Sequence, residues 1–210
     1  IGGSADTTTT GKAYEKLKDF LEQPVQQCET AVFWEKTIYP DEQLLKTLTS
    51  DARCVALPAP DPIISYCSDG REEFTDSLGM VFQKPNEGYF YDLVASPFKG
   101  EITLQDIEKR EWTSIDRKAL EKQADDAAKK AKQLKENSEF AVIASCTVAP
   151  MTISQMLRGF EDWCVDLMME PQLCEAIMDK YIDYQMQINL EFFKKVGPYC
   201  DVAYCLADDI

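Results

Sequence analysis

Strand-like and helical segments alternate along the last part of the chain, and this order limits the fold more than any other feature. Residues 140–144 and 202–206 are short continuous apolar runs, as in strands covered on both faces. A helical pattern at residues 115–136 precedes the first run, and another, beginning at Pro171, precedes the second. Strands joined in this way are parallel and have right-handed crossovers. The order predicts an α/β fold, either a barrel or a doubly wound sheet.

Shorter elements are expected before this region. Apolar residues recur at helical spacing over residues 11–23, with Thr10 as a candidate cap, and again over residues 41–48. Strands are expected at residues 30–34 and 52–57.

A different character marks residues 63–98, where short β-branched and aromatic runs are interrupted by turn signals. The signals are Asp69-Gly70, Gly79 and residues 86–88, and the clearest strand is expected at residues 88–94. We predict an antiparallel hairpin insertion within one domain that spans residues 1–210.

Composition excludes several classes of function. The chain has 37 Asp and Glu against 22 Lys and Arg, and its net charge of −15 disfavours nucleic acids and anionic membrane surfaces. No apolar stretch approaches the roughly 18 residues of a membrane helix. We expect a cytoplasmic protein whose chemistry uses no histidine, since this chain has none.

The eight cysteines are widely spaced, unlike those of a small disulfide-rich domain. We expect them to be reduced, and we expect Cys200 and Cys205 to lie in the core. Cys200 and Cys205 are expected to point to opposite faces of an extended segment, so they do not form a metal site together.

Both ends suggest an incomplete piece of a longer protein. The chain begins with Ile1 rather than Met, and it stops directly after a strand-like run with no closing helix.

Four charged residues are candidates for function. Asp208 and Asp209 follow the strand at residues 202–206, and Glu35 follows the strand expected at residues 30–34. α/β proteins place their chemistry at the carboxyl ends of parallel strands, where carboxylates position a substrate or accept a proton. Helix capping or plain solvation is the alternative for each. Arg158 could hold an anionic substrate group, or it could form a structural ion pair with Glu161 or Asp162.

Several short motifs, in this order and spacing, resemble the uroporphyrinogen decarboxylase superfamily. They are Gly88-Tyr89-Phe90-Tyr91-Asp92, the Ala-Pro step at Ala149-Pro150, Arg158-Gly159-Phe160-Glu161, Pro171-Gln172-Leu173 and Ala207-Asp208-Asp209. The resemblance implies a (β/α)₈ barrel, incomplete in this chain, with its pocket at the carboxyl-terminal rim. It also implies either decarboxylation of a tetrapyrrole or methyl transfer to or from a corrinoid protein or a thiol.

Departures from the family pattern favour the methyltransferase-like branch. Glu35 stands near a family aspartate, Met156 stands where the decarboxylases have a substrate-contacting tyrosine, and Asp208-Asp209 falls near a later Ser-His site. The decarboxylases' arginine-rich motif is absent. We therefore expect Asp208, Asp209 and Glu35 as catalytic residues, with Arg158 and Met156 contacting the substrate.

Cofactors follow from the same resemblance. A corrinoid (cobalamin) would carry the methyl group, and zinc would be held by residues beyond 210, with no metal ligand in this segment. A true decarboxylase would need no cofactor. The alternatives are that decarboxylase and a non-catalytic barrel that binds a tetrapyrrole or a corrinoid protein.

Overall fold

The computed structural model describes residues 7–59, 62–112 and 114–206, which fold into a mixed α/β structure. These residues divide into two compact units. The first holds the described residues up to 59 together with Asp116–Thr147 and Asn189–Leu206, and the second holds residues 62–115 and 148–188.

The first unit contains two sheets and several helices. Its strands are β1 (Thr9–Thr10), β2 (Thr30–Val32), β3 (Thr37–Ile38), β4 (Ala52–Val55), β9 (Ala141–Thr147) and β10 (Val202–Leu206). Its helices are α1 (Gly11–Phe20), α2 (Glu42–Thr47), α4 (Arg117–Asn137), the end of α7 (Pro171–Val196) and a 3₁₀ turn, η2 (Gly197–Tyr199).

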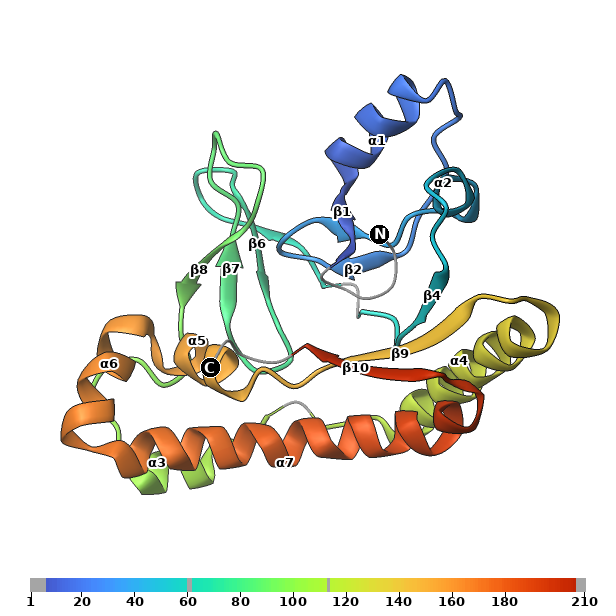
Figure 1. Cartoon of the computed structure of the whole chain (residues 1–210). Helices are drawn as coiled ribbons and strands as arrows, with labels where there is room; N and C mark the ends of the chain where they lie inside the picture. The colour runs from blue at the N-terminus through green and yellow to red at the C-terminus, as the bar shows by residue number, and fades with distance from the viewer. Residues whose placement is uncertain (1–6, 60–61, 113, 207–210) are drawn as a thin grey trace. The chain divides into compact units, whose positions relative to one another are not determined.

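A parallel sheet of order β10-β9-β4 is the centre of this unit (Figure 1). Cys54 is paired with Ile143, and Ala144 is paired with Ala203, so the three strands are in continuous register. Asp201 fixes the start of β10, because its carboxylate accepts a hydrogen bond from the Val142 amide at 3.0 Å and pairs with Lys135. The expected strand–helix–strand order with a parallel sheet is confirmed.

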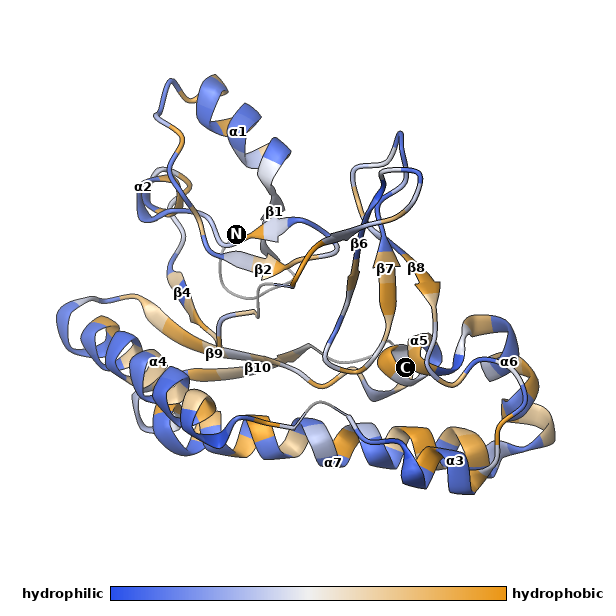
Figure 2. Ribbon diagram, turned by 180° about the vertical axis from the view of Figure 1, so that it is seen from behind, coloured by the Kyte–Doolittle hydropathy of each residue, from blue (hydrophilic) through white to orange (hydrophobic). Residues whose placement is uncertain are grey.

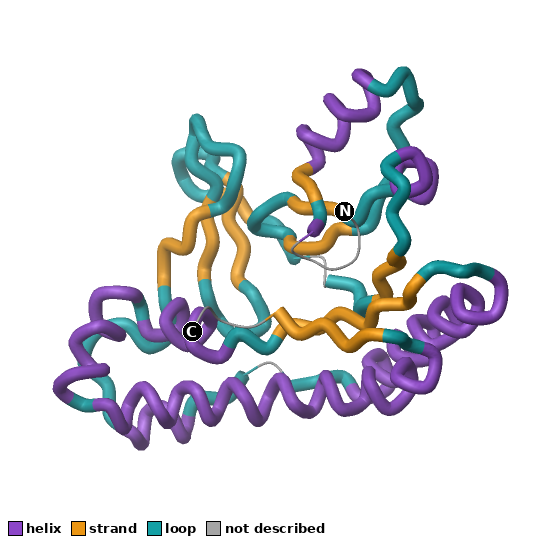
Figure 3. The backbone as a smooth tube through the Cα atoms, viewed as in Figure 1, coloured by secondary structure: helices purple, strands orange, loops and turns teal. Residues whose placement is uncertain are grey.

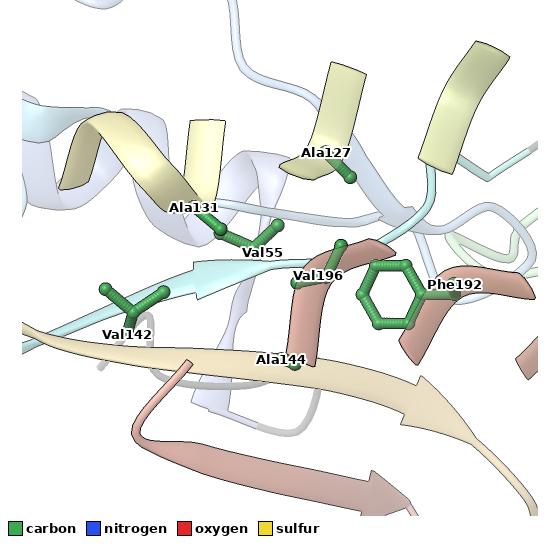
Figure 4. Packing of buried hydrophobic residues seen from close by; sticks show 7 residues of the cluster. All are labelled: Val55, Ala127, Ala131, Val142, Ala144, Phe192 and Val196. Carbon is green, nitrogen blue, oxygen red and sulfur yellow. The ribbon is translucent and has the colours of Figure 1, made fainter. Parts of the chain in front are cut away.

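Helices α4 and α7 pack on the same face of the parallel sheet. One buried cluster joins the two helices to β4 and β9, and Figure 4 shows its seven members: Val55, Ala127, Ala131, Val142, Ala144, Phe192 and Val196. In Figure 2, β9 has the colour of apolar residues, whereas α4 is mostly blue with paler turns. The small residues on α4 allow this otherwise polar helix to lie close to the strands.

The strand expected at residues 30–34 is not part of the parallel sheet. Strand β2 ends at Val32 and pairs antiparallel with β3 in a separate sheet of order β1-β3-β2. The hairpin turn between β2 and β3 contains Lys36 at φ 51°, in the left-handed region that non-glycine residues seldom adopt. The predicted strand is thus present but two residues shorter, and the hairpin was not foreseen because a turn built on lysine gives no sequence signal.

Helix ends are set by side-chain caps. Thr10 caps α1 as expected, since its hydroxyl oxygen accepts a hydrogen bond from the Ala13 amide at 3.3 Å. Helix α1 ends at Phe20, before the expected residue 23, because Glu22 takes φ 53°. Asp41 caps α2 through the Leu44 amide at 3.1 Å.

The second unit contains an antiparallel sheet of order β5-β6-β7-β8 (Figure 3). Its strands are β5 (Ser65–Tyr66), β6 (Glu72–Thr75), β7 (Val81–Gln83) and β8 (Asp92–Ala95), and its helices are α3 (Leu104–Lys109), α5 (Pro150–Arg158), α6 (Phe160–Met169) and the first part of α7. The sheet falls within the residues predicted as a hairpin insertion. Gly70 and Gly79 occupy its turns at φ 84° and 87°, where the sequence predicted turns.

The strand expected at residues 88–94 begins later, at Asp92. Tyr91 just before it packs edge-on against Phe74, with ring centroids 5.2 Å apart, and donates its hydroxyl hydrogen bond to Glu72 at 2.6 Å. Residues 88–91 are thus a loop held by its aromatic side chains.

Candidate functional site

A groove of about 640 Å³ runs along the free edge of β4 in the first unit. Strand β4 pairs only with β9 within the described sheet, so its other edge faces this groove. The segment that continues β4 past its carboxyl end also lines the groove. The lining residues are Gln27, Cys28, Glu29, Thr30, Tyr39, Pro40, Glu42, Leu45, Arg53, Cys54, Ala56, Leu57, Pro58, Ala59, Lys130 and Leu134.

Arg53 lies in the groove wall, where hydrogen bonds hold its side chain in place. Its guanidinium donates to both carboxylate oxygens of Glu42, at 2.7 and 2.9 Å, and to the carbonyls of Ser50 and Ala52, at 2.8 Å each. The guanidinium carbon also lies 3.6 Å from the ring centroid of Phe140. The Arg53 side chain supports α2 and β4, and its charge is fully engaged.

Cys54 places a thiol on the opposite face of β4 from Val55 and the helices. Burial raises its pKa to about 11, although hydrogen bonding with Tyr39 and Ser145 acts in the opposite direction. Ser145 is itself buried on β9. The thiol is therefore protonated at neutral pH, so that it can donate a proton rather than attack as a thiolate.

The rest of the groove is weakly charged. Lys130 of α4 lies 3.6 Å from the Glu29 carboxylate, and both side chains are well exposed to solvent. The groove thus combines apolar residues with two thiols, two hydroxyls and paired charges, a composition suited to a small ligand without a high net charge.

A second thiol feature lies where β9 and β10 end. Cys146 and Cys205 are direct partners in the parallel register, and their Sγ atoms are 3.4 Å apart. Cys146 is partly buried and Cys205 is exposed. The prediction of a core cysteine is wrong for Cys205, because it lies on a surface that the described residues leave uncovered. Cys164 on α6 is also exposed.

Glu35 does not lie at the end of a parallel strand. It is exposed in the hairpin turn between β2 and β3, whose sheet is antiparallel. The positional argument for catalysis at strand ends therefore does not apply to Glu35, and it does not line the β4 groove.

Arg158 is enclosed by oxygen atoms of the second unit. Its Nε donates to Asp166 at 2.6 Å and its Nη1 to Asp162 at 3.1 Å, while the carbonyls of Phe98 and Gly100 accept further hydrogen bonds. The side chain borders a cavity of about 370 Å³ but is only 5% exposed. The structural ion pair is therefore the arrangement found, with Asp166 as its buried partner.

The remaining predicted residues are not brought together. Met156 lies half-buried on α5 and lines neither cavity. Asp208 and Asp209 lie outside the described residues.

The chain was compared with protein-family models, with curated proteins and with solved structures. None of the three comparisons gave a match. The functional interpretation of the groove and of the cysteine pair therefore depends on their geometry alone.

Zinc, which the superfamily resemblance implies, finds no site in the described ranges. Within residues 7–59, 62–112 and 114–206, no three Cys, Asp or Glu side chains gather closely enough to bind a metal ion.

Sequence reasoning missed the two features that the structure brings forward. Cys54 carried a signal, because it stands on the strand expected at residues 52–57, four residues before the proline at position 58. The Cys146–Cys205 contact carried none, because it depends on the register of strands 59 residues apart.

Proposed function

We propose that the chain is part of an α/β-barrel enzyme of the uroporphyrinogen decarboxylase superfamily that transfers a methyl group from a small methylated substrate. The observation that carries the proposal is the parallel sheet β4-β9-β10, whose three strands are paired in chain order, with the second unit's sheet inserted between β4 and β9, while α4 and α7 cover one face. A barrel is built by repeating this arrangement, with helices outside and the site at the carboxyl ends of its strands. A doubly wound sheet instead reverses its strand order at a switch point.

The paired charges favour methyl transfer over decarboxylation. Decarboxylation of a tetrapyrrole requires cations that are free to hold several substrate carboxylates. In the described lining of the two cavities, each Lys or Arg already has a carboxylate partner: Arg53 with Glu42, Lys130 with Glu29, and Arg158 with Asp162 and Asp166. A neutral or singly charged methylated substrate fits these surroundings better.

The β4 groove supplies the groups that such a transfer needs. When the methyl group leaves its substrate atom, that atom keeps the bonding electrons and takes up a proton. Cys54 is a protonated thiol at neutral pH and can provide this proton, while Tyr39 and Ser145 hold the thiol in place. The acceptor is a corrinoid, delivered by a partner protein, or a small thiol.

Methylation of cob(I)alamin tests the proposal directly. The native protein is mixed with cob(I)alamin and, in turn, with methanol, methylamines and methyl thioethers, and the cobalamin spectrum is followed. We expect turnover with one of these donors and a loss of at least tenfold in Cys54→Ala. Cys164→Ala is the matched control, because Cys164 is exposed on α6 and far along the chain from the groove residues.

Other outcomes would redirect the assignment. Release of carbon dioxide from uroporphyrinogen, without methyl transfer, would establish a decarboxylase. Binding of a tetrapyrrole or cobalamin with neither reaction would indicate a non-catalytic barrel. Elemental analysis of the same preparation for zinc tests the metal independently of activity.

A further inference from the structure

Cys146 and Cys205 are placed so that their side chains leave the parallel sheet on the same face and at the same level. They are register partners on β9 and β10, and their Sγ atoms lie 3.4 Å apart. By the alternation along β9, Cys146 shares the face of Val142 and Ala144, which α4 and α7 cover. Cys54 is on the other face, so the pair is distinct from the thiol proposed for methyl transfer.

The backbone spacing permits a bond between the two sulfur atoms. Neighbouring strands lie about 4.8 Å apart, inside the Cα separation of roughly 4.4 to 6.8 Å that a disulfide accepts. The sulfur atoms have to close from 3.4 Å to the bonded distance of about 2.05 Å. Rotation of two side chains can supply this movement without a shift in register.

Such a bond would be easily reduced. Strained and exposed disulfides are more oxidising than structural ones and exchange readily with thiols. The exposure of Cys205 gives small thiols access to the pair.

We propose that Cys146 and Cys205 form a reversible dithiol–disulfide pair that reacts with low-molecular-weight disulfides such as oxidised glutathione. The Cys205 thiolate attacks the small disulfide, forms a mixed disulfide and releases one small thiolate. The Cys146 thiol then loses its proton, and its thiolate attacks the Cys205 sulfur. This closes the Cys146–Cys205 disulfide and releases the second small thiolate. The two protons lost by the cysteines end on the two released thiols, and the two electrons that the cysteines lose reduce the small disulfide.

The bond would tie β9 to β10 one residue before each strand ends, at Thr147 and Leu206. The carboxyl ends of parallel strands are where α/β proteins place their chemistry. Oxidation would hold these two strand ends together, and it therefore links the redox state to the geometry of that edge. This inference does not depend on the methyltransferase proposal.

The test is oxidation of the whole chain by oxidised glutathione. The reaction is stopped with acid, the remaining thiols are alkylated, and the protein is examined by intact-mass measurement and peptide mapping. We expect two fewer of the eight cysteines to be alkylated, a linked peptide that contains Cys146 and Cys205, and complete reversal by excess reduced glutathione. Glutathione left on Cys205 with no linked peptide would overturn the proposal, as would linkage to a different cysteine.

Matched variants separate this pair from general thiol reactivity. Cys146→Ser should stop at the mixed disulfide and gain one glutathione on Cys205, whereas Cys164→Ser should form the linked peptide as the parent does. A linked peptide that persists at Cys205 in Cys146→Ser contradicts the proposal.

Phenylarsine oxide provides a measurement that needs no variant. It binds two neighbouring thiols together and releases water, so it should protect both Cys146 and Cys205 of the parent protein from alkylation. Alkylation of both at the untreated rate would also overturn the proposal.

Discussion

Arg53 and Glu42 form a two-point ion pair that joins the start of α2 to β4, with N–O distances of 2.7 and 2.9 Å. The arginine is only 4% exposed, whereas half of the glutamate side chain is accessible to solvent. Hydrogen bonding from Arg53 lowers the pKa of Glu42, so the carboxylate stays ionised at neutral pH. The same pair closes one wall of the β4 groove.

Replacing Glu42 with Gln should therefore destabilise the fold. The substitution leaves the buried Arg53 charge without a counter-charge, and we expect a loss of about 1–3 kcal/mol in the free energy of unfolding. Chemical denaturation of the parent and the variant measures this loss. Lys46→Gln is the control, because Lys46 meets Glu42 at 3.5 Å on the surface, where a pair contributes at most about 1 kcal/mol. Equal losses in both variants would contradict the role given to Arg53.

The docking of α1 should depend on Asp41. Its carboxylate accepts hydrogen bonds from the Tyr14 hydroxyl at 2.6 Å and the Leu44 amide at 3.1 Å, and it pairs at 3.1 Å with Lys18, which is fully buried. Asp41→Ala leaves a buried lysine unpaired and removes the α2 cap, so we expect a loss of about 3–5 kcal/mol. The exposed Asp19→Ala on α1 should change the free energy of unfolding by no more than about 0.5 kcal/mol.

Acid should weaken the same contact. Burial tends to raise the pKa of Asp41, but the hydrogen bonds from Tyr14 and Lys18 outweigh it, and the pKa lies below the ordinary 3.8. A carboxyl whose pKa is lowered on folding stabilises the fold above its unfolded pKa and loses that contribution as the pH falls. The stability difference between parent and Asp41→Ala should shrink below pH 3.8, as denaturation at a series of pH values would reveal.

Variants of Arg158 and Asp166 distinguish a structural role of Arg158 from a role in substrate binding. Asp166→Ala should cost about 3–5 kcal/mol, because it leaves the buried guanidinium without its nearest carboxylate. Arg158→Lys should cost about 2–3 kcal/mol, because an ammonium cannot span both carboxylates and the carbonyls of Phe98 and Gly100. Glu161→Ala is the control, because Glu161 lies on α6 like Asp166 but is exposed. Unchanged stability in Arg158→Lys together with lost substrate binding would restore the substrate-binding role.

Much of the fold follows from local patterns that the sequence displays. The apolar run at residues 202–206 and the proline that opens α7 predicted a strand and a helix that begin where the structure has them. The β2–β3 hairpin was missed because Lys36 and not glycine takes the left-handed turn position. Local signals thus identify elements well where glycine, proline or periodic burial marks them.

The candidate site was harder to predict because it depends on contacts between distant parts of the chain. The ion pair of Arg158 with Asp162 was among the alternatives predicted, but its buried partner Asp166, eight residues along the chain on α6, was not. The thiols of Cys146 and Cys205 meet only because β9 and β10 are parallel and in register. Sequence spacing contains no information on that register.

The thiol of Cys54 should make stability depend on alkaline pH. Its pKa rises from 9.0 in an exposed chain to about 11 in the fold, chiefly through burial. A pKa raised on folding means that the thiol contributes stability below the unfolded pKa and loses this contribution as the pH rises through the folded value.

We therefore expect the stability difference between the parent and Cys54→Ala to fall by about 2 kcal/mol on going from pH 8 to pH 11, since each pKa unit corresponds to about 1.4 kcal/mol. The comparison with Cys54→Ala cancels the titration of the other cysteines and the tyrosines, which both proteins share. Urea denaturation at fixed ionic strength gives the two free energies. A difference that stays constant over this range would mean that the Cys54 thiol is open to solvent, and it would remove Cys54 as the proton donor in the proposed methyl transfer.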